Sequence, residues 1–304
     1  MAVINFGSIN IDHVYQVDHF VQPGETLASD DYQVLLGGKG ANQSIALANA
    51  GAEVSHVGCI NHNDVHFKQA MIKHGINGRF IRCTDTASGH AIIQVTPSGE
   101  NAIFLFGGAN QEISTHDIQA ALADTQSGDW VLLQNETSGT ADVLAAAKAK
   151  GLKIAFNPAP MTNDIKSLNF THIDLLIVNE VEAAELSDCT QMDDIEAFFH
   201  THFAHAEVII TLGKQGAKFI HARHTDKGDI VIPAFVVEAT DTTAAGDTFI
   251  GFFMAHYQQH KIPQQALKFA CAASALAVTK SGAAQSIPHA DDVEMFLAQH
   301  NQAK

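Results

Sequence analysis

From Trp130 onward, short apolar runs alternate with segments that have the length and pattern of helices. The strand-like runs are residues 130–134, 153–156, 174–178, 207–212, 217–221 and 230–237. The helix-like segments include residues 141–150, with Gly151 as a stop signal, and an alanine-rich segment from 264 to about 279. Strands that alternate with helices indicate a parallel sheet covered by helices. We therefore predict an α/β fold with a doubly wound, mostly parallel central sheet flanked by helices.

The first half of the chain adds strands that do not fit this alternation. A hairpin is predicted at residues 91–95 and 102–106, around a turn sequence that contains Pro97 and Gly99. Both faces of this hairpin carry apolar residues, and residues 13–17 and 27–36 are also extended. We expect these segments, at about 13–36 and 90–107, to form a small sheet apart from the central one, within a single domain of residues 1–304.

A buried first strand is predicted at residues 3–6, and two polar residues, Asn10 and Asp12, follow it. Open α/β sheets bind ligands at the carboxyl ends of their strands. The two side chains are therefore candidates for binding hydroxyl groups, with an ordinary turn pair as the equally supported alternative.

The composition limits the class of function. The chain has 304 residues, of which 46% are hydrophobic, enough for one large α/β domain. Its formal net charge of −16 would repel a phosphate backbone, so we expect no nucleic-acid partner. The apolar runs are shorter than a membrane span, and the chain does not open with a targeting pattern. Four separated cysteines without a C-x-x-C motif indicate reduced thiols, so we expect a cytoplasmic protein.

A glycine-rich stretch, Gly37-Gly38-Lys39-Gly40-Ala41-Asn42-Gln43-Ser44, precedes a helix-like segment. It matches neither the P-loop pattern nor the dinucleotide-binding pattern. The glycines allow a ligand to approach the backbone closely, and Lys39 and Asn42 offer directed donors. A simple glycine turn is the alternative.

A second stretch, Asp241-Thr242-Thr243-Ala244-Ala245-Gly246-Asp247-Thr248-Phe249, joins an apolar strand-like run to an apolar helix. Its small residues leave the first N–H groups of the helix uncovered, and the helix dipole adds partial positive charge there. Such a helix start binds anions. Asp247 is either a first-turn acid that only favours the helix or a general base beside a phosphoryl group.

Both stretches resemble the two signatures of the ribokinase-like sugar kinases, also described as phosphofructokinase-B-type carbohydrate kinases. Further motifs follow in the family order: Gly99-Glu100-Asn101 with Gly108-Ala109-Asn110, Asn179-x-x-Glu182, Thr211-Leu212-Gly213, and Ala277-Val278-Thr279-Lys280-x-Gly282-Ala283. The resemblance covers nearly the whole chain, and six motifs in one order are more specific than any one of them.

The resemblance implies a role for each matching position. Catalysis falls to Asp247 as the base and to the N–H groups of Ala244, Ala245, Gly246 and Asp247, which hold the γ-phosphate. The sugar hydroxyls are bound by Asn10, Asp12, Gly38, Lys39, Asn42, Glu136 and Asp247. ATP, with Mg²⁺, is bound by Asn179, Glu182, Thr211, Gly213, Gly216, Gly246 and Cys271. A K⁺ ion is held, largely through backbone carbonyls, at Asp241, Thr243, Ala277, Lys280, Gly282 and Ser286.

The implied activity is ATP-dependent phosphorylation of a small sugar, with ribose as the expected substrate. Another pentose, a ketohexose or a nucleoside is the alternative within this class, and a non-catalytic sugar-binding regulator is the alternative outside it. The small sheet corresponds to the lid of the family and implies a homodimer. Three positions depart from the family: Asn61-His62-Asn63-Asp64 replaces a Gly-Asp-Asp stretch, Cys271 replaces a histidine near the nucleotide, and Ile250 replaces a common asparagine.

Overall fold

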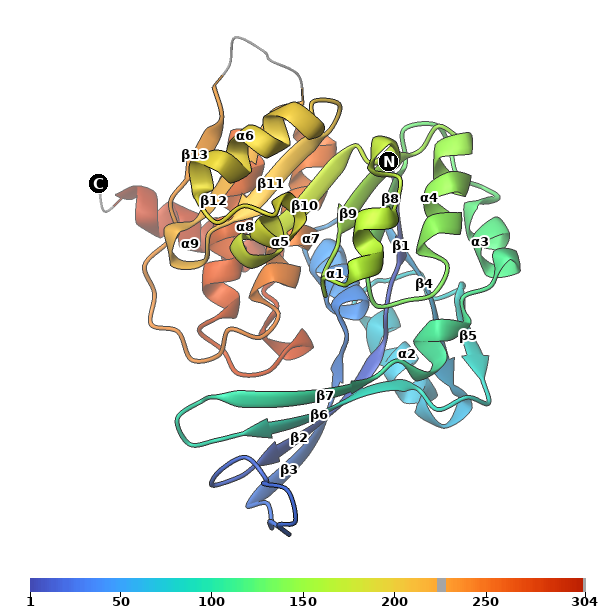
Figure 1. Cartoon of the computed structure of the whole chain (residues 1–304), viewed down its shortest axis with the longest axis vertical. Coiled ribbons are helices and arrows are strands. Elements are labelled where there is room, and N and C mark those ends of the chain that lie inside the picture. The colour runs from blue at the N-terminus through green and yellow to red at the C-terminus, as the bar shows by residue number, and fades with distance from the viewer. Residues whose placement is uncertain (223–227, 303–304) are drawn as a thin grey trace.

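The structure is a computed structural model that describes residues 1–222 and 228–302. Within these residues a nine-stranded sheet has the order β13-β12-β11-β10-β9-β8-β1-β4-β5 (Figure 1). Its strands are β1 (Val3–Phe6), β4 (Val54–Asn61), β5 (Ile81–Thr84), β8 (Trp130–Gln134), β9 (Lys153–Asn157), β10 (Leu175–Asn179), β11 (Glu207–Thr211), β12 (Ala217–Ile220) and β13 (Ile230–Ile232). All neighbours from β5 to β11 pair in parallel, and β12 and β13 add an antiparallel edge.

The inner strands are mostly buried because helices cover both faces of the sheet. Every residue of β1 and of β8 is buried. Continuous apolar runs are typical of such parallel strands, since neither face meets water. The polar exceptions in these two strands, Asn5 and Gln134, are buried as well and bond to each other.

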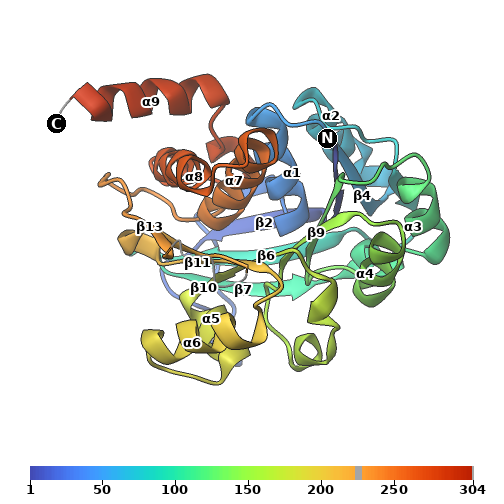
Figure 2. The same ribbon diagram turned by 90° about the horizontal axis from the view of Figure 1, so that it is seen from above.

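Two groups of helices cover the two faces (Figure 2). One face carries α1 (Lys39–Asn49), α2 (Val65–Lys73), α7 (Ala245–His260) and α8 (Pro263–Ala277), with α9 (Ala290–Gln302) outside α8. The other face carries α3 (Thr115–Leu122), α4 (Thr140–Ala149), α5 (Glu180–Ser187) and α6 (Met192–His202). Short 3₁₀ turns lie at His62–Asp64, Gly108–Glu112, Asn163–Ser167, Phe170–His172, Gly213–Gln215 and Ala284–Ser286.

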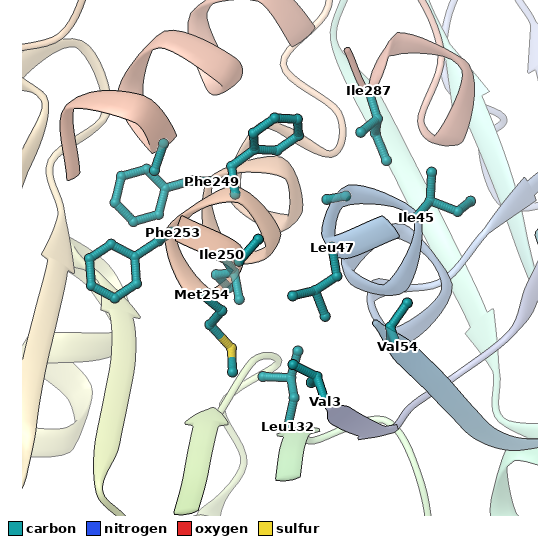
Figure 3. Close-up of a cluster of buried hydrophobic side chains, with 14 of the residues drawn as sticks. Val3, Ile45, Leu47, Val54, Leu132, Phe249, Ile250, Phe253, Met254 and Ile287 are labelled. Carbon is teal, nitrogen blue, oxygen red and sulfur yellow. The ribbon is translucent and has the colours of Figure 1, made fainter. Parts of the chain in front are cut away.

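Helices α1 and α7 pack side by side over the centre of the sheet. Leu47 of α1 and Ile250 and Met254 of α7 point toward Val3 and Leu132 of the sheet (Figure 3). A Cβ atom on Gly251 of α7 would lie 2.4 Å from the Cβ of Ala46 in α1. The helices can therefore approach closely only because small residues face each other, and this contact holds the starts of both helices together.

A second sheet of the described chain contains four strands in the order β3-β2-β6-β7. They are β2 (Asn10–Gln16), β3 (Asp31–Gly37), β6 (Gly89–Val95) and β7 (Asn101–Phe106). This sheet projects from the body beyond the carboxyl ends of β1 and β4 (Figure 1). Several of its large apolar side chains are exposed, among them Phe104 at 70%.

The predicted α/β architecture and the separate small sheet are confirmed by this arrangement. The predicted strand at 230–237 is wrong beyond Ile232, because Pro233 has no N–H group for the sheet and the chain leaves it there. The sequence also predicts a hairpin turn around Lys227 and Gly228, between the runs 217–221 and 230–237, and Lys227 lies outside the described residues. Asn10 and Asp12 are not a turn pair: both lie in β2. Among the described helices we find none with the length and apolar character needed to cross a membrane.

Candidate active site

A cluster of charged side chains lies where β1 and β8 end and the small sheet begins. The Oγ of Ser8, just after β1, donates to the Oε2 of Glu136, just after β8. The backbone N–H of Lys39 donates to the same oxygen at 3.1 Å. Burial raises the pKa of Glu136, and burial together with the charge of Glu136 raises the pKa of Asp12 to about 7. The predicted sugar-binding carboxylates Asp12 and Glu136 are therefore brought together.

Glycine residues allow α1 to start against the end of β1. Gly38, the residue before α1, has φ of 92°, which side-chain-bearing residues rarely adopt. A Cβ atom on Gly40 would lie 2.4 Å from the Cα of Gly7. The glycine-rich stretch is thus a close backbone contact, and it places Lys39 and Asn42 at the carboxyl edge of the sheet.

Asn10 is held in the same region by a residue from a distant part of the chain. The Nδ2 of Asn110 donates to the Oδ1 of Asn10 at 2.7 Å, and the Oδ1 of Asn110 accepts from the backbone N–H of Ile9 at 2.9 Å. Both asparagine side chains are buried. The amide group of Asn10 is consequently held through its Oδ1.

Asp247 lies in the first turn of α7 and faces α1. It is only 8% exposed. Its Oδ2 accepts from the Nδ2 of Asn42 at 3.0 Å, and its Oδ1 accepts from the Nε2 of Gln43 at 2.9 Å. The carboxylate is thus held by two neighbouring amides of the other helix. The side chain of Asp247 is therefore more buried than that of an ordinary first-turn acid, which is exposed to solvent.

Lys39 brings positive charge to these carboxylates. Burial lowers the pKa of its ammonium group, but the charges of Asp247, Glu136 and Glu182 outweigh burial and hold the pKa above its ordinary value. Lys39 therefore carries a proton at neutral pH and lies in the field of all three acids. A cation in this place can attract an anionic phosphoryl group and balance the charge of the site.

The start of α7 borders a cavity of about 210 Å³. Ala244 has φ of 59° and precedes the helix, which begins at Ala245. The N–H of Ala245 differs from our expectation, because it already donates to the carbonyl of Thr242 at 3.2 Å. Gly246 and Asp247 follow in the first turn, where the helix itself offers no acceptor for an N–H group. The cavity is lined by Lys39, Asn157, Ala159, Ile177, Val178, Asn179, Glu182, Thr211, Thr242, Ala244, Gly246, Asp247 and Ile250.

Asn179 and Glu182 meet at the start of α5, and both line this cavity. The backbone N–H of Glu182 donates to the Oδ1 of Asn179 at 2.8 Å, and that of Asn179 donates to the Oε2 of Glu182 at 2.9 Å. The two residues therefore form a capping box. The second carboxylate oxygen of Glu182 stays outside this pair, and burial raises the pKa of the group.

A larger cavity of about 510 Å³ also borders the start of α7 and shares lining residues with the smaller one. Predicted nucleotide-binding residues line it: Thr211, Gly213, Gly216, Gly246 and Cys271. Most of the remaining lining is apolar, with Phe235, Val237 and Phe249 among it. Burial raises the pKa of the Cys271 thiol to about 12, so the group is neutral at physiological pH. The cavity suits a flat heterocycle better than a charged group.

The predicted monovalent-cation residues come from two loops that Asp241 ties together. Its Oδ1 accepts from the N–H and the Oγ1 of Thr243, at 2.8 and 2.6 Å. Its Oδ2 accepts from the N–H of Gly282 at 2.9 Å. The backbone N–H of Asp241 donates to the carbonyl of Val278 at 3.1 Å. The other predicted members, Ala277, Lys280 and Ser286, lie at the end of α8 and in the loop that follows it.

Several side chains of the site were missed by the sequence analysis. Gln43 contacts Asp247 directly, and Ser8 contacts Glu136. Ser8 directly follows the first strand, so its position at a strand end was a usable signal. The sequence gave no signal for the contact of Gln43, because its partner Asp247 is 204 positions away.

Comparisons with known proteins show the family of this chain. Residues 2–290 match the pfkB family of carbohydrate kinases. The ribokinase of Haemophilus influenzae is 38% identical over 303 residues, which cover 96% of each chain. The crystal structure of ribokinase from Thermotoga maritima has a TM-score of 0.85 at 34% identity and covers 98% of this chain and 99% of that chain. Arabidopsis thaliana ribokinase, solved in complex with ribose and ATP, has a TM-score of 0.83 at 26% identity. The match covers 97% of this chain and 98% of that chain.

The fold is that of a sugar kinase. The chain belongs to the pfkB family of carbohydrate kinases. Within that family it is similar to ribokinases along almost its whole length.

Proposed function

We propose that this carbohydrate kinase transfers the γ-phosphoryl group of ATP to ribose and forms ribose 5-phosphate and ADP. The observation that carries the proposal is the position of Asp247. Its buried carboxylate lies at the start of α7 and accepts a hydrogen bond from Asn42, one of the predicted sugar-binding residues. Asp247 also lines the cavity of about 210 Å³, together with Asn179 and Glu182, which are predicted to bind ATP with Mg²⁺. The ribokinases named above, one of them in complex with ribose and ATP, support ribose as the acceptor.

In the proposed reaction Asp247 accepts the proton of the attacking hydroxyl while that oxygen forms its bond to the γ-phosphorus. The bond from phosphorus to the oxygen bridging the β- and γ-phosphates breaks, and that oxygen leaves with ADP. The N–H groups of Gly246 and Asp247 and the ammonium of Lys39 face the charge on the transferred group. Phosphoryl transfer depends mainly on positioning and charge stabilisation, and these residues supply both.

Asn10, Asp12, Asn42 and Glu136 are proposed to bind the sugar hydroxyls. Asn42 Oδ1 is buried and has no hydrogen-bond partner among the described residues, so it is available to a hydroxyl group. A pocket of paired polar groups rejects analogues that lack a hydroxyl, because its own buried groups are then left unpaired.

Mg²⁺ is proposed to bind with ATP near Glu182. One carboxylate together with phosphate oxygens and water is the ligand set that Mg²⁺ prefers, and Glu182 offers an oxygen not used in its capping box. The ion supplies charge neutralisation on the phosphates. A K⁺ ion is proposed beside Asp241, where a carboxylate and two loops rich in carbonyl groups converge.

We also propose that the four-stranded sheet is a lid over the sugar and that two lids meet in a homodimer. Its exposed apolar side chains support this, since large exposed apolar patches usually mark a contact. A cytoplasmic location is proposed from the four unpaired cysteines.

A coupled ADP-release assay tests the function with ribose, 2-deoxyribose, fructose and adenosine as acceptors. We expect the highest kcat/KM with ribose. If another acceptor gives a higher kcat/KM, that acceptor replaces ribose as the proposed substrate, and the protein remains a sugar or nucleoside kinase. An absence of turnover with all acceptors, together with measurable sugar binding, would favour the non-catalytic regulator instead.

A further inference from the structure

Asp247 is held through both of its carboxylate oxygens. One bond comes from Asn42, which also faces the sugar region, and the other comes from Gln43. Gln43 is fully buried. Its amide therefore has no direct access to solvent and bonds only within the protein, to Asp247, Asn157 and Gln134.

The amide of Gln43 can donate to Asp247 only in one orientation, and its neighbours enforce it. Its Oε1 accepts from the Nε2 of Gln134 at 2.7 Å, so its NH₂ group points the other way. That NH₂ group also approaches the Oδ1 of Asn157 at 3.3 Å, and the Nδ2 of Asn157 donates to the carbonyl of Ile177 at 3.0 Å. A flip of the Gln43 amide would put donor against donor at Gln134 and acceptor against acceptor at Asp247.

Gln134 is fixed in turn by the first strand. Its Nε2 also donates to the Oδ1 of Asn5 at 3.0 Å. Asn5 then donates to the carbonyl of Gly40 and to the Oγ of Ser44, both at 2.8 Å. All of these side chains are buried. The Oε1 of Gln134 has no hydrogen-bond partner among the described residues, whereas both ends of the Gln43 and Asn5 amides are paired. This pairing restricts the orientation of the two amides.

We propose that Gln43 is a positioning residue for the phosphoryl transfer: it holds Asp247 at the angle from which its carboxylate takes the hydroxyl proton, and Gln134 locks Gln43. The inference rests on the proposed role of Asp247 as the base. A carboxylate that accepts two hydrogen bonds from a rigid helix loses rotational freedom before the sugar arrives. Catalytic groups have to be held this closely, because a misplacement of about 1 Å can cost about a hundredfold in rate.

The test begins with Gln43→Met, which keeps the length of the side chain and removes the amide. We expect kcat to fall by about 10- to 100-fold. KM for the sugar should change much less, because Asn10, Asp12 and Asn42 remain. Gln258→Met is the matched control: Gln258 is a buried glutamine at the other end of α7, and its replacement should leave kcat close to that of the wild type.

A double-mutant cycle separates positioning from general support of the fold. In the Asp247→Asn background no base is left to position, so adding Gln43→Met should lower the residual rate by less than about twofold. A loss of the same factor in both backgrounds would overturn the proposal, as would a folded Gln43→Met enzyme with nearly normal kcat.

If Gln43→Met does not fold, Gln134→Met decides the question in the same cycle, because it leaves Gln43 in place and frees its amide to turn. The proposal is supported if Gln134→Met lowers kcat by less than the 10- to 100-fold expected for Gln43→Met and has no effect in the Asp247→Asn background. An unchanged kcat of the Gln134→Met enzyme contradicts the proposal. The base assignment is tested separately. If Asp247→Asn itself keeps its activity, the proposed function of Asp247 fails, whatever Gln43 does.

Discussion

Asn42 of α1 donates from its Nδ2 to the Oδ2 of Asp247 in α7 across 3.0 Å, although 205 positions separate the two residues in sequence. The other end of the same amide, Oδ1, has no partner within the described chain. Asn42 therefore links the proposed base to the place where a sugar hydroxyl would bind. Together with the bond from Gln43 to Asp247, this contact connects the two signature stretches of the family.

The replacement Asp247→Asn tests the base directly. An amide has nearly the same shape as the carboxylate but is a very poor base, so kcat should fall by about a hundred- to ten-thousandfold. Sugar binding should weaken much less. Asn42 can turn its amide and accept from the new NH₂ group, so the loss of stability should stay near 1 kcal/mol. Steady-state kinetics and thermal unfolding measure both effects.

A folded Asp247→Asn enzyme with kcat within a few-fold of the wild type would contradict this assignment. The acid would then serve only the start of α7, and another residue would have to take the proton.

Sugar affinity should depend on the ionisation of Asp12. Burial and the nearby Glu136 raise the pKa of Asp12 from 3.8 to about 7 in the sugar-free protein. The ionised form is the better acceptor for a hydroxyl, so KM for the sugar should be about tenfold higher at pH 6 than at pH 8. KM for ATP, measured in parallel, should change little over this range. A sugar KM that stays flat between these pH values would contradict the prediction.

The same pKa predicts a trend in stability. Between about pH 4 and pH 7 the folded state keeps the proton on Asp12 and the unfolded state releases it. The contribution of Asp12 to the free energy of unfolding therefore falls as pH rises through this window. Asp12→Asn should remove that part of the pH dependence, which urea unfolding at several pH values would measure.

Activity should depend on a small monovalent cation beside Asp241. Replacing K⁺ by tetramethylammonium at constant ionic strength keeps general screening equal, and we expect kcat to fall by about tenfold because the loop before α7 loses its support. Asp241→Ala breaks the ties to Thr243 and Gly282, so the variant should show a low rate that no longer responds to K⁺. If the wild type has the same kcat with K⁺ and with tetramethylammonium, the predicted dependence on a small cation is wrong.

The exposed face of the lid should form the dimer. Phe104 is 70% exposed and lies on β7, on the same face as Phe106 and Ile92 of the small sheet. Phe104→Asp places a charge in the proposed contact and should weaken dimerisation by at least about a hundredfold. Met295→Asp is the control, since Met295 is an exposed apolar residue of α9, 58% exposed, away from the lid. Sedimentation at micromolar concentration, with and without sugar, measures the result, and a monomeric wild type would contradict the prediction.

The sequence by itself determined the architecture, because that depends on local patterns. Continuous apolar runs predicted the parallel strands, glycine stops predicted helix ends, and the hairpin at 91–106 followed from its turn residues. The helix start at residues 244–247 was also predicted from the sequence, since small residues and an acid favour a first turn, although the N–H of Ala245 is already paired. The strand at 230–237 was overestimated because apolar character alone does not show that Pro233 ends the pairing.

Only the tertiary structure decided which residues surround the carboxylate of Asp247. Gln43 occupies a helix position that no periodicity distinguishes from a core site, and its role appears only when α1 packs against α7 through Ala46 and Gly251. Likewise, the raised pKa of Asp12 arises from burial and from the charge of Glu136, a residue that follows the distant strand β8. Hydrogen bonds and charge effects act over a few ångströms in space and carry no trace in sequence spacing. The packing of two helices on one sheet therefore made the site out of residues that the sequence had left separate.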